Sequence, residues 1–205
     1  MARFATGKHA FGISDRSGMK YRSALTIHFK PGKSRVAIPL LRDLWNGATI
    51  MRRVGKETAL IGMYKDVDTL EELKSLANMK IADKLDPMII DGSVNHHLWR
   101  HNLGDAHHSN VVKVFGTTFK NVFAYEEVEG VIEENINIAT QNGKKMTHWR
   151  KLFESPNGPK YILTMHYNSL DECADDLPVP AMRKNHMLVR SRISDLQESV
   201  WMKVD

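Results

Sequence analysis

The chain has 205 residues, of which 42% are hydrophobic and 26% charged, a composition typical of a folded globular protein rather than a disordered one. No apolar run approaches the roughly 20 residues that span a bilayer, and the N-terminus lacks the apolar stretch of a secretory signal, so we expect neither membrane contact nor secretion. Cys173 is the only cysteine, which excludes a disulfide within the chain and a zinc site built on cysteines.

The formal net charge of +5 is distributed unevenly along the chain. Residues 1–56 contain 12 Lys and Arg against 2 Asp, a formal charge of +10, whereas residues 57–205 carry −5. A basic leading segment joined to an acidic body indicates contact with an anionic partner, or head-to-tail association of copies of the chain.

Residues 1–22 are predicted to form an extended basic arm, because Gly7, Gly12 and Gly18 recur among polar residues without a sustained apolar period. Residues 23–205 are predicted to form a single α+β domain, a strand-rich mixture with a few helices. The strands are not interleaved with regular amphipathic helices, which argues against a doubly wound parallel sheet.

The first part of this domain combines strands with two helical segments. Strands are expected at 24–29, at 36–41, where Pro39 favours a sheet edge, and at 49–54 and 58–64. Residues 40–45 have helical spacing that the turn at 46–47 ends. Thr69 lies three residues before Glu72, the spacing of a capping box, and predicts a helix that ends at Pro87 at the latest.

The second part is expected to begin with an irregular polar stretch over residues 91–110. Strands are predicted at 111–115 and 119–125, joined by a hairpin turn at 116–118, and again at 161–167 and 187–189. Residues 128–138 have mixed periodicity, which leaves a long strand and a helix both open. Asn142-Gly143 predicts a turn, and the spacing of Ser194 and Gln197 predicts a final helix over 195–202.

The basic arm is the main candidate for a binding surface. Aromatic and basic side chains interleave along it, which suits docking on a neighbouring subunit or contact with nucleic acid phosphates and bases. The predicted contact residues are Arg3, Phe4, Lys8, Phe11, Arg16, Lys20, Tyr21 and Arg22.

A cluster of histidines between His96 and His108 raises the alternative of a metal site. His97 and His101 are four residues apart and would share one face of a helix. Leu98 stands where the zinc-protease pattern His-Glu-x-x-His requires glutamate, so a polar surface loop or subunit contact is favoured. No nucleotide-binding glycine motif or Gly-x-Ser-x-Gly occurs, and therefore no catalytic residue, cofactor or metal is predicted.

The segment from Phe4 to Arg22 resembles the opening of small virion-associated proteins of tailed bacteriophages, especially marine ones. Those proteins begin with a core of the form Asp-Arg-x-Gly-aromatic-basic-Tyr, which corresponds here to the residues that start at Asp15-Arg16. Ser14 and Ser17 stand where some members carry cysteines. The segment from Leu41 to Gly47 resembles a further basic-x-x-Trp-x-Gly segment of the family.

The resemblance implies a non-enzymatic structural component of a tailed phage virion, at the head–tail connector, in the neck or in the tail. Its implied partners are copies of itself and other virion proteins, reached through the arm, and its implied location is the virion after assembly in the host cytoplasm. DNA is a further partner that the basic arm would suit. Two alternatives stay open: a nucleic-acid-binding module that uses the arm, and a metal-dependent nuclease or hydrolase that uses the histidine cluster.

Overall fold

The computed structural model describes residues 21–55, 60–77, 83–105, 107–152 and 158–204. They form a mixed α+β fold, as expected, whose centre is a closed barrel of antiparallel strands. The predicted arm lies outside the described residues except for Tyr21 and Arg22, which open the first strand rather than belonging to an arm. Within the described residues no helix is both long enough and apolar enough to cross a membrane.

The chain divides into two consecutive units with the same order of main strands and helices. The elements of the N-terminal half are β1 (Tyr21–Phe29), α1 (Ser34–Leu44), β2 (Thr49–Arg53), β3 (Leu60–Val67), α2 (Leu70–Ala77), the short η1 (Asp86–Met88) and β4 (Ile89–Gly104). The elements of the C-terminal half are β5 (Val111–Phe119), α3 (Val122–Glu126), α4 (Glu129–Gln141), β6 (Lys145–Lys151), β7 (Tyr161–Tyr167), α5 (Leu170–Ala174), η2 (Pro180–Met182), α6 (Arg183–Arg192) and β8 (Ile193–Lys203). Each half is therefore a βαββαβ unit.

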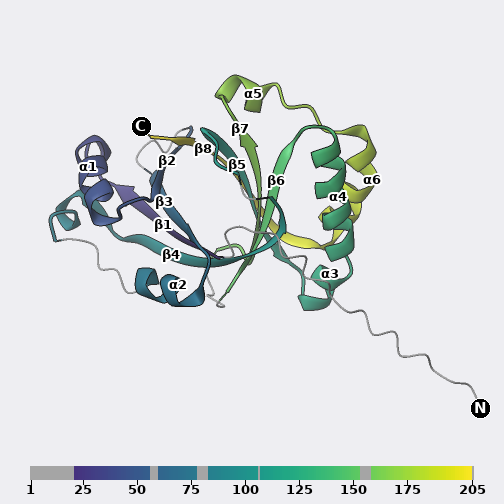
Figure 1. Cartoon of the computed structure of the whole chain (residues 1–205), viewed down its shortest axis with the longest axis horizontal. Coiled ribbons are helices and arrows are strands. Elements are labelled where there is room, and N and C mark those ends of the chain that lie inside the picture. Colours follow the sequence, from purple (N-terminus) through teal and green to yellow (C-terminus); the bar gives the residue numbers. More distant parts are fainter. Residues whose placement is uncertain (1–20, 56–59, 78–82, 106, 153–157, 205) are drawn as a thin grey trace, which may run out of the picture.

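The strand order around the barrel is β1-β3-β2-β8-β5-β7-β6-β4. Each half contributes four neighbouring strands, and two junctions join the halves: β2 pairs with β8, and β4 pairs with β6. Figure 1 shows the helices outside this barrel, with α1 and α2 beside the N-terminal strands and α3, α4 and α6 beside the C-terminal ones. Closure of the sheet leaves no unpaired strand edge along most of its circumference.

Several predicted elements are confirmed. Strands lie at β1, β2, β3 and β7, the turn at 142–143 follows α4, and the helix α2 begins where the capping-box spacing placed it. There the Thr69 Oγ1 accepts a hydrogen bond from the backbone N of Glu72 at 3.2 Å. The open choice over residues 128–138 is resolved as the helix α4, which buries Ile132 and Ile136.

Other predictions were wrong because packing between distant segments outweighed local pattern. Residues 36–41 lie in the helix α1, where Ala37 and Leu41 face the core one turn apart despite Pro39. Residues 119–125 end β5 and start α3, so there is no hairpin at 116–118, and residues 187–189 lie in the helix α6. The final helix is instead β8, which pairs with β5 and β2.

The largest error concerns residues 91–110, which were expected to be irregular. Most of them belong to β4, a strand of 16 residues that pairs with β1 on one side and β6 on the other. A polar sequence can form this strand because neighbouring strands on both sides satisfy its backbone N–H and C=O groups, independently of its side chains. Its end at Gly104, with a φ of 82° and no room for a Cβ beside the carbonyl of Met146, requires glycine.

Each sheet half is covered on both faces and therefore serves two cores. One set of side chains packs against the helices outside the barrel, in separate clusters for the two halves. The other set faces the barrel interior, where Trp99, Trp149 and Ile162 from both halves pack together. Along β7 the two sets alternate, since Ile162 belongs to the interior cluster while Leu163 packs with the helix side.

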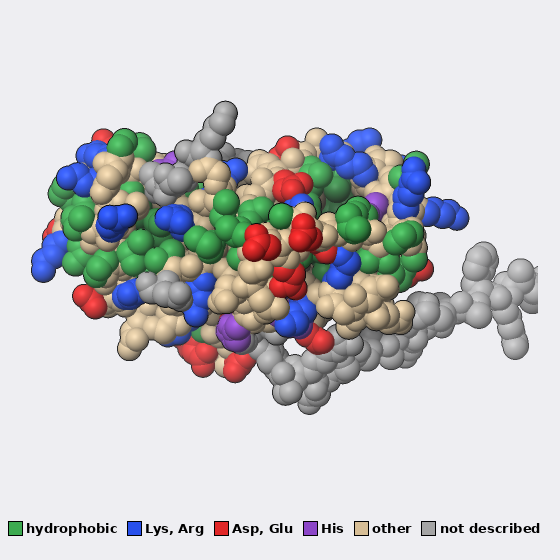
Figure 2. All heavy atoms as spheres, turned by 90° about the horizontal axis from the view of Figure 1, so that it is seen from above, with side chains coloured by type: hydrophobic (Ala, Val, Ile, Leu, Met, Phe, Trp, Pro, Cys, Tyr) green, Lys and Arg blue, Asp and Glu red, His purple; other side chains and the backbone are tan. Residues whose placement is uncertain are grey.

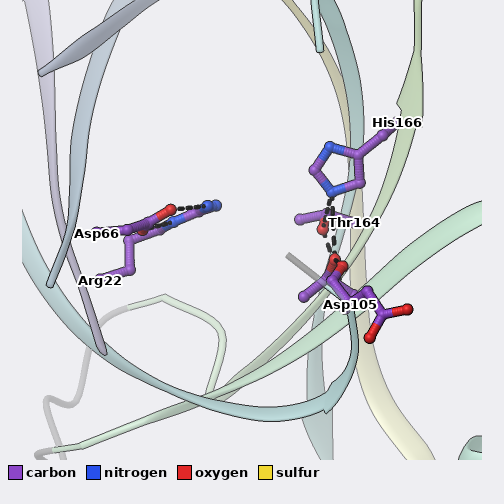
Figure 3. A network of polar contacts seen from close by, with 6 residues as sticks. Arg22, Asp66, Asp105, Thr164 and His166 are labelled. Carbon is purple, nitrogen blue, oxygen red and sulfur yellow. Dashed lines mark hydrogen bonds and ion pairs between the residues drawn. The ribbon is translucent and has the colours of Figure 1, made fainter. Parts of the chain in front are cut away.

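The barrel interior also holds a buried ion pair that joins β1 to β3. The Arg22 guanidinium donates to both carboxylate oxygens of Asp66, with Nε to Oδ1 at 2.6 Å and Nη2 to Oδ2 at 2.8 Å (Figure 3). It lies over the ring of Tyr64 at 4.0 Å and that of Trp149 at 4.2 Å. Arg22 was predicted to contact a partner, but it is only 6% exposed and its charge is neutralised within its own subunit.

The surface does not reproduce the charge division of the sequence. On the face in Figure 2, acidic side chains gather near the middle, and Lys and Arg side chains are more frequent toward the two ends. Acidic groups of the C-terminal half are also paired locally, as in the contacts of Glu127 with Arg192 and of Glu198 with Lys113. On this face, therefore, basic and acidic side chains do not divide between the N-terminal and C-terminal halves.

The Arg22–Asp66 pair predicts a large asymmetry between single and double substitutions. Arg22→Ala or Asp66→Ala should each lower the free energy of unfolding by about 3–5 kcal/mol, because each leaves one buried charge without a partner. The double variant Arg22→Met with Asp66→Leu should lose much less than the sum. Urea titrations measure these values, and Lys74→Ala, which removes an exposed pair with Glu71, is the control with an expected change below about 1 kcal/mol. Additive losses would contradict a coupled buried pair.

Candidate functional site

A cavity of about 440 Å³ lies in the C-terminal half, between the outer face of the sheet and the helices that cover it. The side chains that form its walls are mostly apolar and come from β5, β6, β7, α4, η2 and α6, including Phe115, Phe119, Ile132, Ile136, Met146, Leu163, Met165, Val179, Met182 and Val189. Its size falls within the range of about 300–1,000 Å³ typical of sites for small molecules. Two polar side chains, His148 and Asn135, interrupt this apolar lining where they are themselves buried.

His148 reaches the cavity because of its position in β6. The strand places Met146 and His148 toward the helices, whereas Thr147 and Trp149 belong to the opposite face. His148 is 3% exposed, and its ring is stacked parallel to that of Tyr161 at 5.9 Å. A buried imidazole on an apolar wall requires a hydrogen-bond partner, and the neighbouring strand supplies one.

That partner is Asn102, which occupies a bulge in β4. The pairing of β4 with β6 shifts by one residue between His101, opposite Trp149, and Leu103, opposite His148. Asn102 is the extra residue, and its Nδ2 lies 3.2 Å from His148 Nδ1. Bulges commonly redirect a side chain in this way. The bulge also turns Leu103 to the helix side, where it packs against the outer core.

The contact continues from Asn102 to the helices. Asn102 Nδ2 donates to the hydroxyl oxygen of Tyr125 at 2.9 Å, and that hydroxyl donates to Glu129 Oε1 at 2.8 Å. Burial, followed by the hydrogen bond to Glu129, raises the pKa of Tyr125, so its hydroxyl keeps its proton. Because an amide NH₂ can only donate, Nδ1 of His148 is an acceptor and its proton is on Nε2.

His148 is therefore held neutral in one tautomer. Burial lowers the pKa of His148 to about 4, with a smaller contribution from His101. A neutral imidazole with a proton on Nε2 can donate a hydrogen bond to an oxygen of a bound molecule without carrying charge into an apolar site. The network of Asn102, Tyr125 and Glu129 thus fixes both the position and the protonation of the one imidazole on the buried wall.

The opening of the cavity carries charged groups. Lys144 forms an ion pair with Asp176 and donates to the carbonyl of Leu177 at 2.7 Å, and Lys113 pairs with Glu198 at 2.8 Å. Arg190 and His186, both exposed on α6, contribute to the same lining. The lining therefore combines apolar walls with a few charged groups that are already paired, as sites for small molecules commonly do.

The predicted site residues do not come together here. The arm residues Arg3, Phe4, Lys8, Phe11, Arg16 and Lys20 lie outside the described residues, so their role as contacts stays a prediction. Tyr21 and Arg22 belong to β1, in the barrel rather than in an arm.

The histidine cluster is divided between different environments. His97 and His101 lie on a strand rather than a helix, which separates them by about 13 Å along β4. His96 contacts Ser23 Oγ at 2.7 Å, and His107 packs edge-on against His166 at 5.4 Å. Among the described residues, no group of three or more His, Cys, Asp or Glu side chains could hold a metal ion.

Sequence reasoning missed Asn135 and His148, which line the cavity. It also missed Asn102, which contacts His148 from behind the wall, and Tyr125, which contacts Asn102. One signal was present for Asn135, which interrupts the apolar stripe formed by Ile132, Ile136 and Ala139 on α4. His148 and Asn102 had no comparable signal, since their contact depends on a bulge between strands more than 40 residues apart.

No protein-family model and no curated protein matches the sequence. Solved structures share the fold over nearly the whole chain. An anthrone oxidase-like protein aligns with a TM-score of 0.65 and 11% identity, covering 92% of this chain and 93% of its own. A proposed monooxygenase from Fusobacterium nucleatum aligns with a TM-score of 0.63 and 12% identity, covering 92% and 94%.

A chlorite dismutase variant from Candidatus Nitrospira defluvii also aligns, with a TM-score of 0.59, 10% identity and coverage of 92% and 93%. At these identities the likeness establishes the fold. It contradicts the expectation of a non-enzymatic virion component, because the proteins that share the barrel are described as enzymes of oxidation or of chlorite breakdown. The phage resemblance itself rests largely on residues 4–20, which lie outside the described part, and stays untested.

The buried histidines predict a loss of stability in acid. Burial lowers the pKa of His148 to about 4 and, with Arg22 as the next cause, that of His166 to about 3. As pH falls below about 6.5, the unfolded chain takes up protons that the folded chain does not. The free energy of unfolding should therefore decrease from pH 7 toward pH 4. Urea titrations at successive pH values test this.

The variants His148→Gln and His166→Gln should each flatten that pH dependence. A pH profile that is identical in all three proteins would contradict the assignment.

Proposed function

We propose that this protein is an oxidoreductase that binds an apolar aromatic small molecule in the C-terminal cavity. The observation that carries the proposal is His148, a buried neutral imidazole on an otherwise apolar wall, fixed by Asn102 from the opposite half of the barrel. A purely structural core has no need of such a donor beside a cavity of about 440 Å³. The oxidising enzymes that share the fold support the same class of reaction.

The geometry suits an aromatic ketone or phenol. The apolar walls, with Phe115 and Phe119 among them, would bury the ring system, and its oxygen would accept a hydrogen bond from His148 Nε2. Such a bond stabilises the negative charge that develops on the oxygen when a C–H group conjugated with it loses its proton to solvent, because a preorganised donor in an apolar site is worth more than one in water. An electron-rich anion of this kind is the form of the substrate that dioxygen oxidises.

Anthrone is the appropriate first substrate, given the anthrone oxidase-like neighbour. Its methylene carbon would become a carbonyl, with dioxygen supplying one oxygen atom to the product quinone and releasing the other as water with the two methylene hydrogens. The reaction needs dioxygen as oxidant, and it can be followed by oxygen uptake and by quinone absorbance.

We expect the protein to accelerate anthrone oxidation above the rate in buffer. His148→Ala should lower kcat/KM by roughly 10- to 100-fold, because it removes a donor to the developing oxyanion. Leu163→Trp should abolish the protein-dependent rate by filling the cavity. Lys145→Ala, an exposed residue of the same strand β6, is the matched control and should retain the full rate.

Asn102→Ala tests the positioning of His148 separately from the contact of His148 with the substrate. It leaves the His148 ring in place but removes its hydrogen bond, so it should lower kcat/KM by an intermediate factor. An oxygen-uptake rate equal to that in buffer, or one that Leu163→Trp leaves unchanged, would refute oxidation of such a substrate in the cavity. Thermal melts of each variant exclude loss of the fold as the cause.

A further inference from the structure

Asn135 is a buried polar residue whose side-chain oxygen has no hydrogen-bond partner among the described residues. It projects from α4 within the buried stripe of Ile132, Ile136 and Ala139, is 6% exposed, and lines the cavity. Its Oδ1 is fully buried and, among the described residues, has no hydrogen-bond partner. A buried acceptor left unsatisfied costs about 1–3 kcal/mol, so a leucine at this position would serve the core better.

We propose that Asn135 Oδ1 accepts a hydrogen bond from a hydroxyl group of the bound molecule, so that the preferred ligand is a hydroxylated aromatic compound, and a hydrocarbon or a ketone without a hydroxyl binds more weakly. The inference rests on the proposed function, since it concerns the occupant of the same cavity. It adds a preference for a hydroxyl group on the ligand, which the barrel fold alone does not imply.

The surroundings favour a neutral donor. A protonated amine would bring a charge beside Asn135, yet the carboxylate in the cavity lining, Asp176, is already paired with Lys144. A bound water needs two to four polar partners, and the side chains around Asn135 on α4 are apolar. A hydroxyl carried on an aromatic ring satisfies Oδ1 and buries its own apolar body against Ile132 and Ile136 at the same time.

The two buried polar groups would then bind different groups of one ligand, one a hydrogen-bond donor and the other an acceptor. Asn135 comes from the helix layer and presents an acceptor, and His148 comes from the sheet and presents a donor. A ring system with a hydroxyl directed to α4 and a second oxygen directed to β6 meets both. A site of this kind rejects analogues that lack the hydroxyl more strongly than a purely apolar site could, because the acceptor would stay unpaired.

The test compares 2-naphthol with 2-methoxynaphthalene, which share a ring system but differ in the donor. In fluorescence titrations the wild-type protein should bind 2-naphthol about tenfold more tightly. Asn135→Leu, which is close in size, should remove this preference by weakening 2-naphthol binding and leaving 2-methoxynaphthalene binding equal or stronger. Glu133→Gln, on the exposed side of α4, is the control and should keep the wild-type preference.

A second measurement distinguishes a ligand-binding role from a structural one. Without ligand, Asn135→Leu should raise Tm by roughly 2–6 °C, because it replaces an unsatisfied buried amide with an apolar side chain. A lower Tm would show that Asn135 supports the fold through its own contacts and would overturn the proposal.

The outcomes for the two proposals differ. Equal affinity of the wild-type protein for both probes, with Leu163→Trp still blocking them, overturns the hydroxyl preference and leaves the cavity as the site of oxidation. Persistence of the 2-naphthol preference in Asn135→Leu likewise overturns it. A tenfold preference that Asn135→Leu abolishes, in a protein that oxidises neither anthrone nor a hydroxylated anthrone, supports the hydroxyl contact and removes the proposed reaction. Failure of both probes to bind would count against both proposals.

Discussion

The rest of the structure depends on a sheet that packs on both of its faces. Strands of both halves send some side chains inward, to a core shared by the halves, and others outward, to a layer of helices. In an ordinary antiparallel sheet one face contacts water and the alternation separates apolar from polar residues. Here side chains on both faces of the sheet pack against other parts of the protein, so the alternation distributes them between two cores. The two cores differ in composition. The inner one holds the Arg22–Asp66 pair together with Trp99 and Trp149, whereas the outer one in the C-terminal half surrounds the cavity.

This constraint explains how a residue of the N-terminal half takes part in a site of the C-terminal half. Since β4 pairs with β6, its side chains near the junction lie beside those of β6 on both faces. A single extra residue in β4 is enough to send Asn102 outward to His148, while His101 stays against Trp149. The site is thus a product of barrel closure rather than of one βαββαβ unit.

The sequence predicted the mixed α+β class, the strands β1, β2, β3 and β7 and the cap of α2, because these depend on local alternation and local hydrogen bonds. It failed for β4 and β8, whose polar residues lie in strands only because partners on both sides complete their hydrogen bonding. It failed for the cavity for the same reason, since nothing near His148 in the chain indicates Asn102. Arg22 illustrates a further error: the sequence pattern predicts a surface charge, whereas the guanidinium is neutralised inside the barrel.

The two consecutive units have a consequence for how the chain could be divided. The N-terminal unit ends its own four-strand sheet with β2 and β4, and the C-terminal unit ends with β8 and β6. Produced as separate polypeptides, each would present two rows of unsatisfied backbone groups that match those of the other in spacing and direction. The pieces would therefore recombine as a noncovalent pair in preference to persisting alone. A gene interrupted between the units could in this way still yield an intact molecule.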